Sequence, residues 1–250
     1  MEEQFLLGNR RGIKLSCLYN PSKKKIPVIM SHGFTGDKHE SGLFDRIAGD
    51  LSDAGFPVIR FDFAGSGESG DDSLSVDKEV EDLSRITEFI SDKGFDDYFL
   101  LGFSLGGLVS LKSAGSRVRA MMLLAPVTDK IRYSWEDRFS PWQLKEAEEK
   151  GFFLYYRTDD VIRKEYRIDR RMQEDRTNVD QAALCGNVRC PVLIYHGTED
   201  SSVPIDNSAS AVKLLPEGSR LEKIEGEGHV FSNSAALLGK AAVNWFSDFL

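Results

Sequence analysis

The sequence is poor in cysteine and has no cysteine pattern that would hold a metal. Only three of its 250 residues are cysteine, namely Cys17, Cys185 and Cys190. None of them forms the closely spaced pair that is typical of a structural zinc site. A small, odd number of thiols indicates a reducing compartment and no disulfide framework. We therefore expect a protein that folds without disulfides and without a structural metal.

Long apolar runs and a leader are absent as well. No stretch approaches the roughly 18 uncharged apolar residues that a membrane-spanning helix needs. The opening residues Glu2-Glu3-Gln4 lack the positive segment and the apolar run of a signal peptide. We therefore expect a cytoplasmic, unprocessed protein with no membrane span.

Positive charge is in deficit, since 32 Lys and Arg face 40 Asp and Glu, which gives a net charge of −8. There is no basic block, so a polyanionic backbone would be repelled and nucleic acid is excluded as a favoured partner. What is present is an ordinary globular mixture, with 41% hydrophobic and 29% charged residues. A chain of this length can bury a large core within one domain.

Segments of strand character alternate with segments of helical periodicity, which is typical of an α/β protein. Such alternation predicts a mostly parallel sheet with helices on both faces. The first two segments flank the turn residues 8–11 and read as a hairpin. The eight predicted strands are residues 4–7, 12–18, 28–31, 58–63, 98–102, 118–124, 192–196 and 221–225.

Between residues 128 and 187 the alternation stops, and aromatic and charged residues become dense. We interpret this segment as a small helical cap inserted into a core formed by residues 1–127 and 188–250. Because the cap connects two strands, we expect it to lie over the carboxyl ends of the sheet. Its aromatic side chains Trp135, Phe139 and Trp142 are then predicted to line a substrate pocket. In the alternative interpretation, the apolar residues of the cap only attach it to the sheet.

The strand at 98–102 runs into Gly102-Phe103-Ser104-Leu105-Gly106, and a helix follows. A G-x-S-x-G motif between a strand and a helix forms a sharp, strained turn that holds the serine hydroxyl above the sheet. Glycine is needed on both sides because the turn leaves no room for side chains. We predict that Ser104 is a nucleophile, and the alternative is a helix-capping serine in a tight turn.

A serine nucleophile needs a base, and the chain has four histidines. His229 follows the last predicted strand in a glycine-containing loop, at the edge where open α/β sheets place their sites. His196 is interpreted as a packed core residue, His32 as a residue that orders its loop, and His39 as a surface residue. We predict His229 as the base.

The base must be oriented by an acceptor on its other ring nitrogen. Asp200 follows the strand at 192–196 and is the predicted acid, although it also fits a turn-capping aspartate. Glu199 beside it and Asp129 after the neighbouring strand are the rivals. The chain order Ser104, Asp200, His229 agrees with nucleophile, acid and base in hydrolases of the elbow type.

Negative charge on a substrate carbonyl oxygen needs preorganised donors, and backbone amides serve this purpose. Leu105, at the start of the helix, supplies one. The glycine-rich segment His32-Gly33-Phe34-Thr35-Gly36 can turn a second amide inward, and we predict that of Phe34. An ordinary glycine turn is the alternative.

Together these motifs resemble the α/β-hydrolase superfamily, and the resemblance covers nearly the whole chain. Within this superfamily the chain resembles small prokaryotic carboxylesterases, including the cinnamoyl (feruloyl) esterases, which carry a comparable HGFTG loop and a short cap. The resemblance implies an eight-stranded α/β-hydrolase fold and a Ser104, His229, Asp200 triad. The implied reaction is hydrolysis of a small-molecule ester, of short acyl or hydroxycinnamoyl type, without a cofactor. Monoacylglycerol lipase, thioesterase and serine aminopeptidase activities remain alternatives.

Two further alternatives lie outside hydrolysis. Residues 65–70 match the G-x-G-x-x-G dinucleotide fingerprint, but acidic residues follow the third glycine where a helix should begin. This disfavours a nucleotide-binding oxidoreductase. A non-catalytic binding protein on the same scaffold would not need an intact triad. The sequence does not decide between a monomer and a homodimer.

Overall fold

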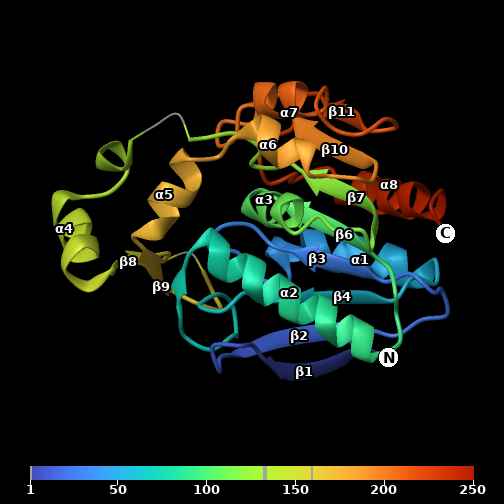
Figure 1. Cartoon of the computed structure of the whole chain (residues 1–250), viewed down its shortest axis with the longest axis horizontal. Coiled ribbons are helices and arrows are strands. Elements are labelled where there is room, and N and C mark those ends of the chain that lie inside the picture. Colours follow the sequence, from blue (N-terminus) through green and yellow to red (C-terminus); the bar gives the residue numbers. More distant parts are fainter. Residues whose placement is uncertain (1, 132–133, 159) are drawn as a thin grey trace.

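The computed structural model describes residues 2–131, 134–158 and 160–250. At its centre is an eight-stranded sheet of order β1-β2-β4-β3-β6-β7-β10-β11 (Figure 1). Its strands are β1 (Glu3–Gly8), β2 (Lys14–Asn20), β3 (Val28–Ser31), β4 (Val58–Phe61), β6 (Tyr98–Phe103), β7 (Val118–Leu124), β10 (Val192–Gly197) and β11 (Arg220–Ile224).

The sheet is parallel except at one edge. The β1–β2 hairpin and the β2–β4 pair are antiparallel, whereas every pair from β4 to β11 is parallel. The predicted eight-stranded, mostly parallel sheet is therefore confirmed, and the hairpin register pairs Gly8 with Lys14. The long crossovers that parallel strands require are supplied by helices.

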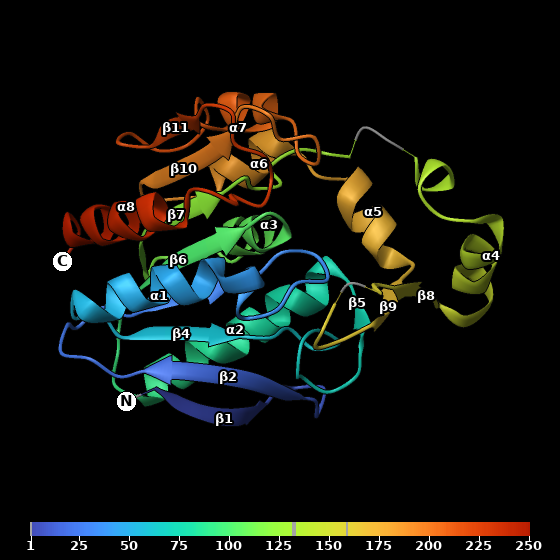
Figure 2. The same ribbon diagram turned by 180° about the vertical axis from the view of Figure 1, so that it is seen from behind.

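Helices cover both faces of the sheet, as Figures 1 and 2 show from opposite sides. They are α1 (Leu43–Asp53), α2 (Val76–Asp92), α3 (Leu105–Lys112), α6 (Gln181–Gly186), α7 (Ile205–Ala211) and α8 (Ala235–Ser247). Along β3, Val28 and Met30 pack into the cluster formed with α1 and α8, whereas Ile29 packs into the cluster formed with α2 and α3. Burial on both faces explains why the central strands are continuous apolar runs.

The segment between β7 and β10 contains strands as well as helices. Its elements before α6 are η2 (Trp135–Asp137), α4 (Pro141–Lys150), β8 (Phe152–Tyr156), β9 (Glu165–Asp169) and α5 (Arg171–Thr177). Strand β8 pairs antiparallel with β9, which pairs parallel with β5 (Ser73–Leu74) in a second sheet of three strands. The expectation of a purely helical cap is wrong, because β8 and β9 form a sheet with β5, which lies in the connection between β4 and α2.

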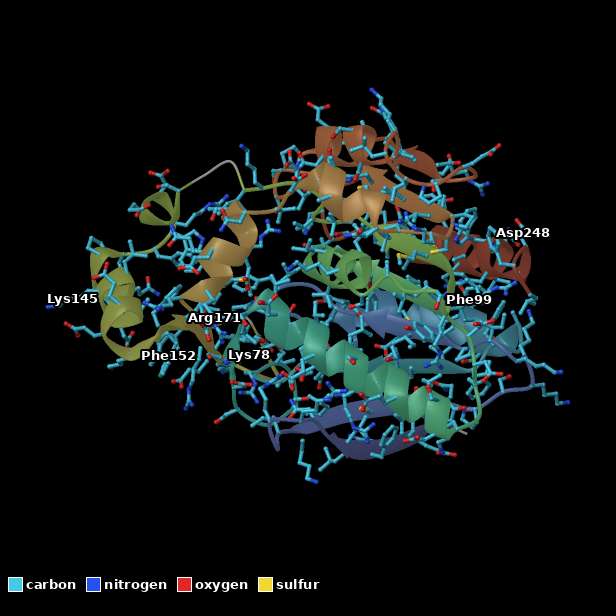
Figure 3. All side chains as sticks on the ribbon, in the orientation of Figure 1. Lys78, Phe99, Lys145, Phe152, Arg171 and Asp248 are labelled. Carbon is cyan, nitrogen blue, oxygen red and sulfur yellow. The ribbon has the colours of Figure 1, made fainter. Side chains whose placement is uncertain are left out.

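We call residues 134–177 of this segment the cap. It lies beyond the carboxyl ends of the central strands, while both chain termini lie at the opposite end of the molecule (Figure 2). Lys145 on α4 points outward, far from Asp248 near the C-terminus (Figure 3). Helix α6 instead contacts α3 and α7 of the core. In the described ranges, no helix has the length and apolar character needed to cross a bilayer.

Candidate active site

Ser104 lies at the sharp turn between β6 and α3. Its φ of 51° places it in the left-handed region that non-glycine residues rarely occupy. A Cβ atom on Gly106 would overlap the backbone carbonyls of Ser31 and His32, and one on Gly102 would lie 2.5 Å from the carbonyl oxygen of Gly106. The two glycines of the motif are therefore required by close backbone approach, and the turn has the geometry that the sequence predicts.

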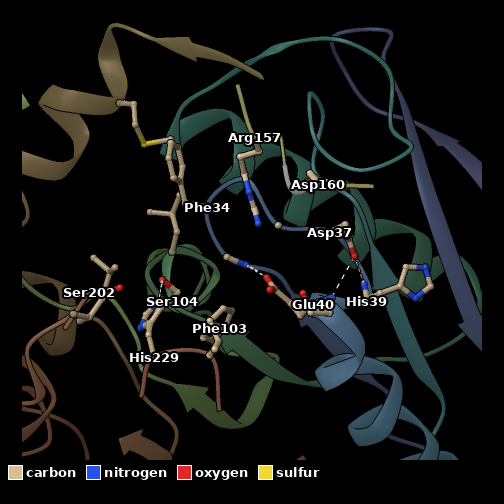
Figure 4. Close-up of a pocket in the computed structure, with 18 of the residues that line it drawn as sticks. Phe34, Asp37, His39, Glu40, Phe103, Ser104, Arg157, Asp160, Ser202 and His229 are labelled. Atoms are coloured by element: carbon tan, nitrogen blue, oxygen red, sulfur yellow. Dashed lines mark hydrogen bonds between the residues drawn. The ribbon is translucent and has the colours of Figure 1, made fainter. Parts of the chain in front are cut away.

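Ser104, His229 and Asp200 form a continuous hydrogen-bonded chain. The Nε2 atom of His229 lies 3.0 Å from the Oγ atom of Ser104 (Figure 4). The Nδ1 atom of His229 lies 2.7 Å from the Oδ2 atom of Asp200. Since a carboxylate only accepts, Nδ1 carries the proton and Nε2 is left to accept from the serine hydroxyl. The three residues come from loops at the carboxyl ends of β6, β10 and β11.

The carboxylate of Asp200 is buried and fully engaged. Its Oδ1 atom accepts hydrogen bonds from the amides of Ser202 at 2.8 Å and Val203 at 2.9 Å. Asp200 therefore caps its turn and contacts His229 at the same time. Burial alone would raise the pKa of Asp200, but hydrogen bonds from His196 and His229 outweigh it and hold that pKa well below its usual range. Asp200 therefore stays ionised.

The rival acids lie elsewhere. The carboxylate of Asp129 accepts from the amide of Lys130 at 2.8 Å, and Glu199 is exposed. The geometry thus selects Asp200 as the partner of His229.

The other three histidines have structural contacts. His32 is buried, with Nδ1 2.8 Å from the carbonyl oxygen of Gly33 and Nε2 accepting from the amide of Phe63 at 3.0 Å. His39 is half-exposed and lies beside Asp45. His196 is buried, but its Nε2 atom also lies 3.1 Å from the Oδ2 atom of Asp200. This second contact to the acid was not predictable from the sequence, because a histidine at a strand end carries no local signal of its partner.

The loop after β3 brings Phe34 to the cavity that contains the serine. Phe34 and Leu105 both line the cavity that contains Ser104 and His229, and neither amide donates to an acceptor within the described part of the chain. Their placement agrees with the predicted pair of donors. The loop is anchored by the buried Nζ atom of Lys38, which lies 2.7 Å from both Asp62 and Glu68.

The carboxylate of Asp62 also explains why residue 67 is a glycine. A Cβ atom on Gly67, whose φ is 47°, would overlap the carboxylate of Asp62. Glu68 donates its amide to that carboxylate at 2.8 Å, and its side chain binds Lys38. This segment therefore packs against a buried carboxylate, where a nucleotide phosphate would be repelled.

A cavity of about 570 Å³ opens at Ser104 and extends beneath the cap. Trp135 and Phe139 line it, as predicted, and their ring centroids are 4.9 Å apart. Trp142 is 58% exposed and does not line the cavity, so its predicted place in the pocket is corrected. The first turn of α4 points this ring to solvent.

Several polar lining residues were not anticipated. Asp37 and Glu40 come from the loop that carries Phe34, whereas Arg157 and Asp160 come from the connection after β8. The Nη1 atom of Arg157 donates to the carbonyl oxygen of Thr35 at 2.9 Å, which ties the cap to that loop. No local pattern marks these residues, since only the tertiary fold brings the cap onto the loop.

A model of the alpha/beta hydrolase family matches residues 28–238. The chain belongs to the α/β-hydrolase family. Among relatives, a Mycoplasma genitalium protein described as an esterase/lipase is 29% identical over 112 residues, 44% of this chain and 41% of that protein. The pimeloyl-[acyl-carrier protein] methyl ester esterase of Nitrosomonas europaea is 26% identical over 207 residues, 71% of this chain and 78% of that protein.

Solved structures agree with this assignment of the fold. Est1E from Butyrivibrio proteoclasticus, solved with ferulic acid bound, superposes with a TM-score of 0.79 at 20% identity. The match covers 98% of each chain. Together with the esterase relatives, the family match supports an enzyme of the α/β-hydrolase class with esterase or related hydrolase activity.

Proposed function

We propose that this α/β-hydrolase is a serine carboxylesterase that works through an acyl-enzyme on Ser104. The observation that carries the proposal is the hydrogen-bonded chain from Ser104 through His229 to Asp200, open to a cavity beside the Phe34 and Leu105 amides. A strained serine with a base and an orienting acid is the arrangement used for nucleophilic attack on a carbonyl.

In acylation, the Oγ atom of Ser104 attacks the ester carbonyl carbon while Nε2 of His229 takes the hydroxyl proton. The Phe34 and Leu105 amides stabilise the negative charge that forms on the carbonyl oxygen. Asp200, ionised and buried, stabilises the resulting imidazolium. The ester C–O bond then breaks, and the alcohol leaves with the proton from His229.

Deacylation repeats these steps with water as the nucleophile. His229 takes a proton from the water, the hydroxide adds to the acyl carbon, and the tetrahedral intermediate collapses to release the acid. Ser104 recovers its proton from His229. The chain's own groups supply every proton transfer in this cycle.

The preferred acyl group is proposed to be short or hydroxycinnamoyl. Phe34, Trp135 and Phe139 give the cavity aromatic walls, and a ring packed against such walls gains about 0.5 to 1.5 kcal/mol beyond its area burial. A volume of about 570 Å³ accommodates a molecule of that size. Ferulic acid bound to the similar fold of Est1E supports the same class.

A second candidate, monoacylglycerol hydrolysis, is favoured by the apolar rim of the cavity. Val161 is 92% exposed there, and Val230 and Ile162 are also exposed. Such side chains could hold the remainder of a long acyl chain at the mouth of the cavity.

The test is a panel of p-nitrophenyl esters of increasing acyl length together with methyl ferulate. We expect the highest kcat/KM for acyl groups of about two to six carbons or for the ferulate. A maximum at long acyl chains favours the monoacylglycerol candidate. Labelling by an organophosphonate at a residue other than Ser104 refutes the serine mechanism.

A further inference from the structure

Glu40 places its carboxyl group beneath the loop that carries Phe34. Its Oε1 atom accepts a hydrogen bond from the amide of Gly33, the residue before Phe34 (Figure 4). The same oxygen packs against Gly36, where a Cβ atom would overlap it. The carboxyl therefore fills the inside of the loop and holds the peptide unit adjacent to the proposed oxyanion donor.

The backbone around this contact is strained. Thr35, Glu40 and Ser41 have φ values of 54°, 45° and 53°, all in the left-handed region. Such a conformation is costly for a non-glycine residue and persists only where the surroundings enforce it. Here the strain turns Glu40 back toward Gly33, so the fold maintains this particular contact.

Few charged groups surround the Glu40 carboxyl. Burial raises its pKa to about 8, a hydrogen bond from Gly33 opposes this effect, Asp37 adds to it and Arg157 opposes it. The other ionisable side chains that line the cavity are His39, Asp160, Arg176 and His229. Lys38 points the other way, to Asp62 and Glu68. Burial therefore favours the neutral form of this carboxyl.

We propose that Glu40 is a positioning residue that, as a neutral acid, holds the His32–Gly33 peptide next to the Phe34 amide, and that its ionisation weakens oxyanion stabilisation. This inference rests on the proposed function. A neutral carboxyl accepts from Gly33 without adding charge, whereas a carboxylate would place negative charge beside the donor for the oxyanion.

The experiment compares kcat/KM between about pH 6 and 10 for the wild-type enzyme, Glu40→Gln and Glu40→Ala. We expect the wild type to lose about tenfold through an alkaline limb near pH 8, a fraction of the ~10²-fold cost of removing a whole oxyanion donor. Glu40→Gln keeps an acceptor for Gly33 but cannot ionise, so its profile should lack the alkaline limb. Glu40→Ala loses the acceptor and should have a lower kcat at every pH.

Glu79 offers a matched control, because it is another buried glutamate with a raised pKa but lies on α2 outside the cavity lining. Glu79→Gln should keep the alkaline limb. A limb that persists unchanged in Glu40→Gln overturns the inference, as does a Glu40→Ala enzyme with the wild-type kcat and pH profile.

A second readout does not depend on catalysis. The NMR shifts of the Gly33 and Phe34 amides should titrate near pH 8 in the wild type and not in Glu40→Gln. If the wild type cleaves no ester in the panel, the proposed function fails and the amide titration still tests the position of Glu40. Amide shifts that stay constant from about pH 7 to 9 overturn the inference on their own.

Discussion

At the scale of single residues, Ser104 is the group on which the proposed chemistry depends most. Ser104→Ala should lower kcat for an activated ester by a factor on the order of 10⁴ or more, because triad members act as a unit. The melting temperature should stay near that of the wild type, since only a hydroxyl group is lost. Ser116→Ala, at an exposed position between α3 and β7, is the control. Near-normal turnover by Ser104→Ala would contradict the mechanism.

His196 is the residue whose role was least visible before the fold was known. Its Nε2 atom faces both the carbonyl oxygen of Val203 at 2.9 Å and Asp200 at 3.1 Å, so that nitrogen carries the proton and donates. In His196→Leu, Asp200 loses this donor and should hold the proton on His229 more tightly. We expect kcat/KM to fall about tenfold, the equivalent of one hydrogen bond, and its acid limb to move to higher pH.

His196→Gln can still donate and should recover much of the loss. Urea unfolding of both variants separates this effect from general destabilisation. An acid limb that does not move in His196→Leu would show that the contact with His196 does not affect how Asp200 acts on His229.

At the scale of elements, the cap decides which acyl groups fit. Phe139 lines the cavity and packs 4.7 Å from the ring of Phe153, whereas Trp142 on α4 points to solvent. Phe139→Ala should lower the kcat/KM ratio of methyl ferulate to p-nitrophenyl acetate by about two- to tenfold, since an aromatic contact is worth about 0.5 to 1.5 kcal/mol. Trp142→Ala should leave that ratio unchanged. Equal effects of the two substitutions would remove Phe139 from the pocket.

The core elements were predictable from sequence because each carries its own signal. Strands such as β3 and β6 are short apolar runs, and α1 repeats Leu43, Ile47 and Leu51 on one face. The nucleophile turn was predictable for the same reason, since its glycines are imposed by local crowding.

The cap and the polar side of the cavity depend on contacts between distant segments. Strand β9 pairs with the two-residue β5, and Ser73 lies opposite Arg167. Glu40 acquires its role only when the chain reverses at strained residues to reach Gly33. Hydrophobic periodicity and secondary-structure propensity carry no information about such pairings. For this reason the strands of the cap, and the contact of Glu40 with Gly33, were not predicted from the sequence.

At the scale of the whole molecule, buried acids make stability depend on pH. Burial raises the pKa of Glu79 well above its usual value, and Asp82 and Asp175 add to this effect while Arg176 opposes it. The folded chain then keeps a proton that the unfolded chain releases above about pH 4.3. The free energy of unfolding should therefore fall as pH rises from about 5 to 8.

Glu79→Gln removes this proton and should lose less stability over the same pH interval. Urea unfolding at the two pH values measures the difference, with wild type as the reference. An identical pH dependence in the variant would show that Glu79 is ionised in the folded chain.

The base His229 lies in the loop that follows an edge strand of the central sheet. Strand β11, which precedes its loop, is the outermost strand, pairs only with β10 in the central sheet, and has no fully buried residue. Edge strands with few buried contacts open at a lower free energy than the core. Mild denaturant should accordingly detach the base from Ser104 while the central strands remain folded. Inactivation would then precede global unfolding. Loss of activity would follow the local opening of β11, whereas the folding transition would follow the loss of the core.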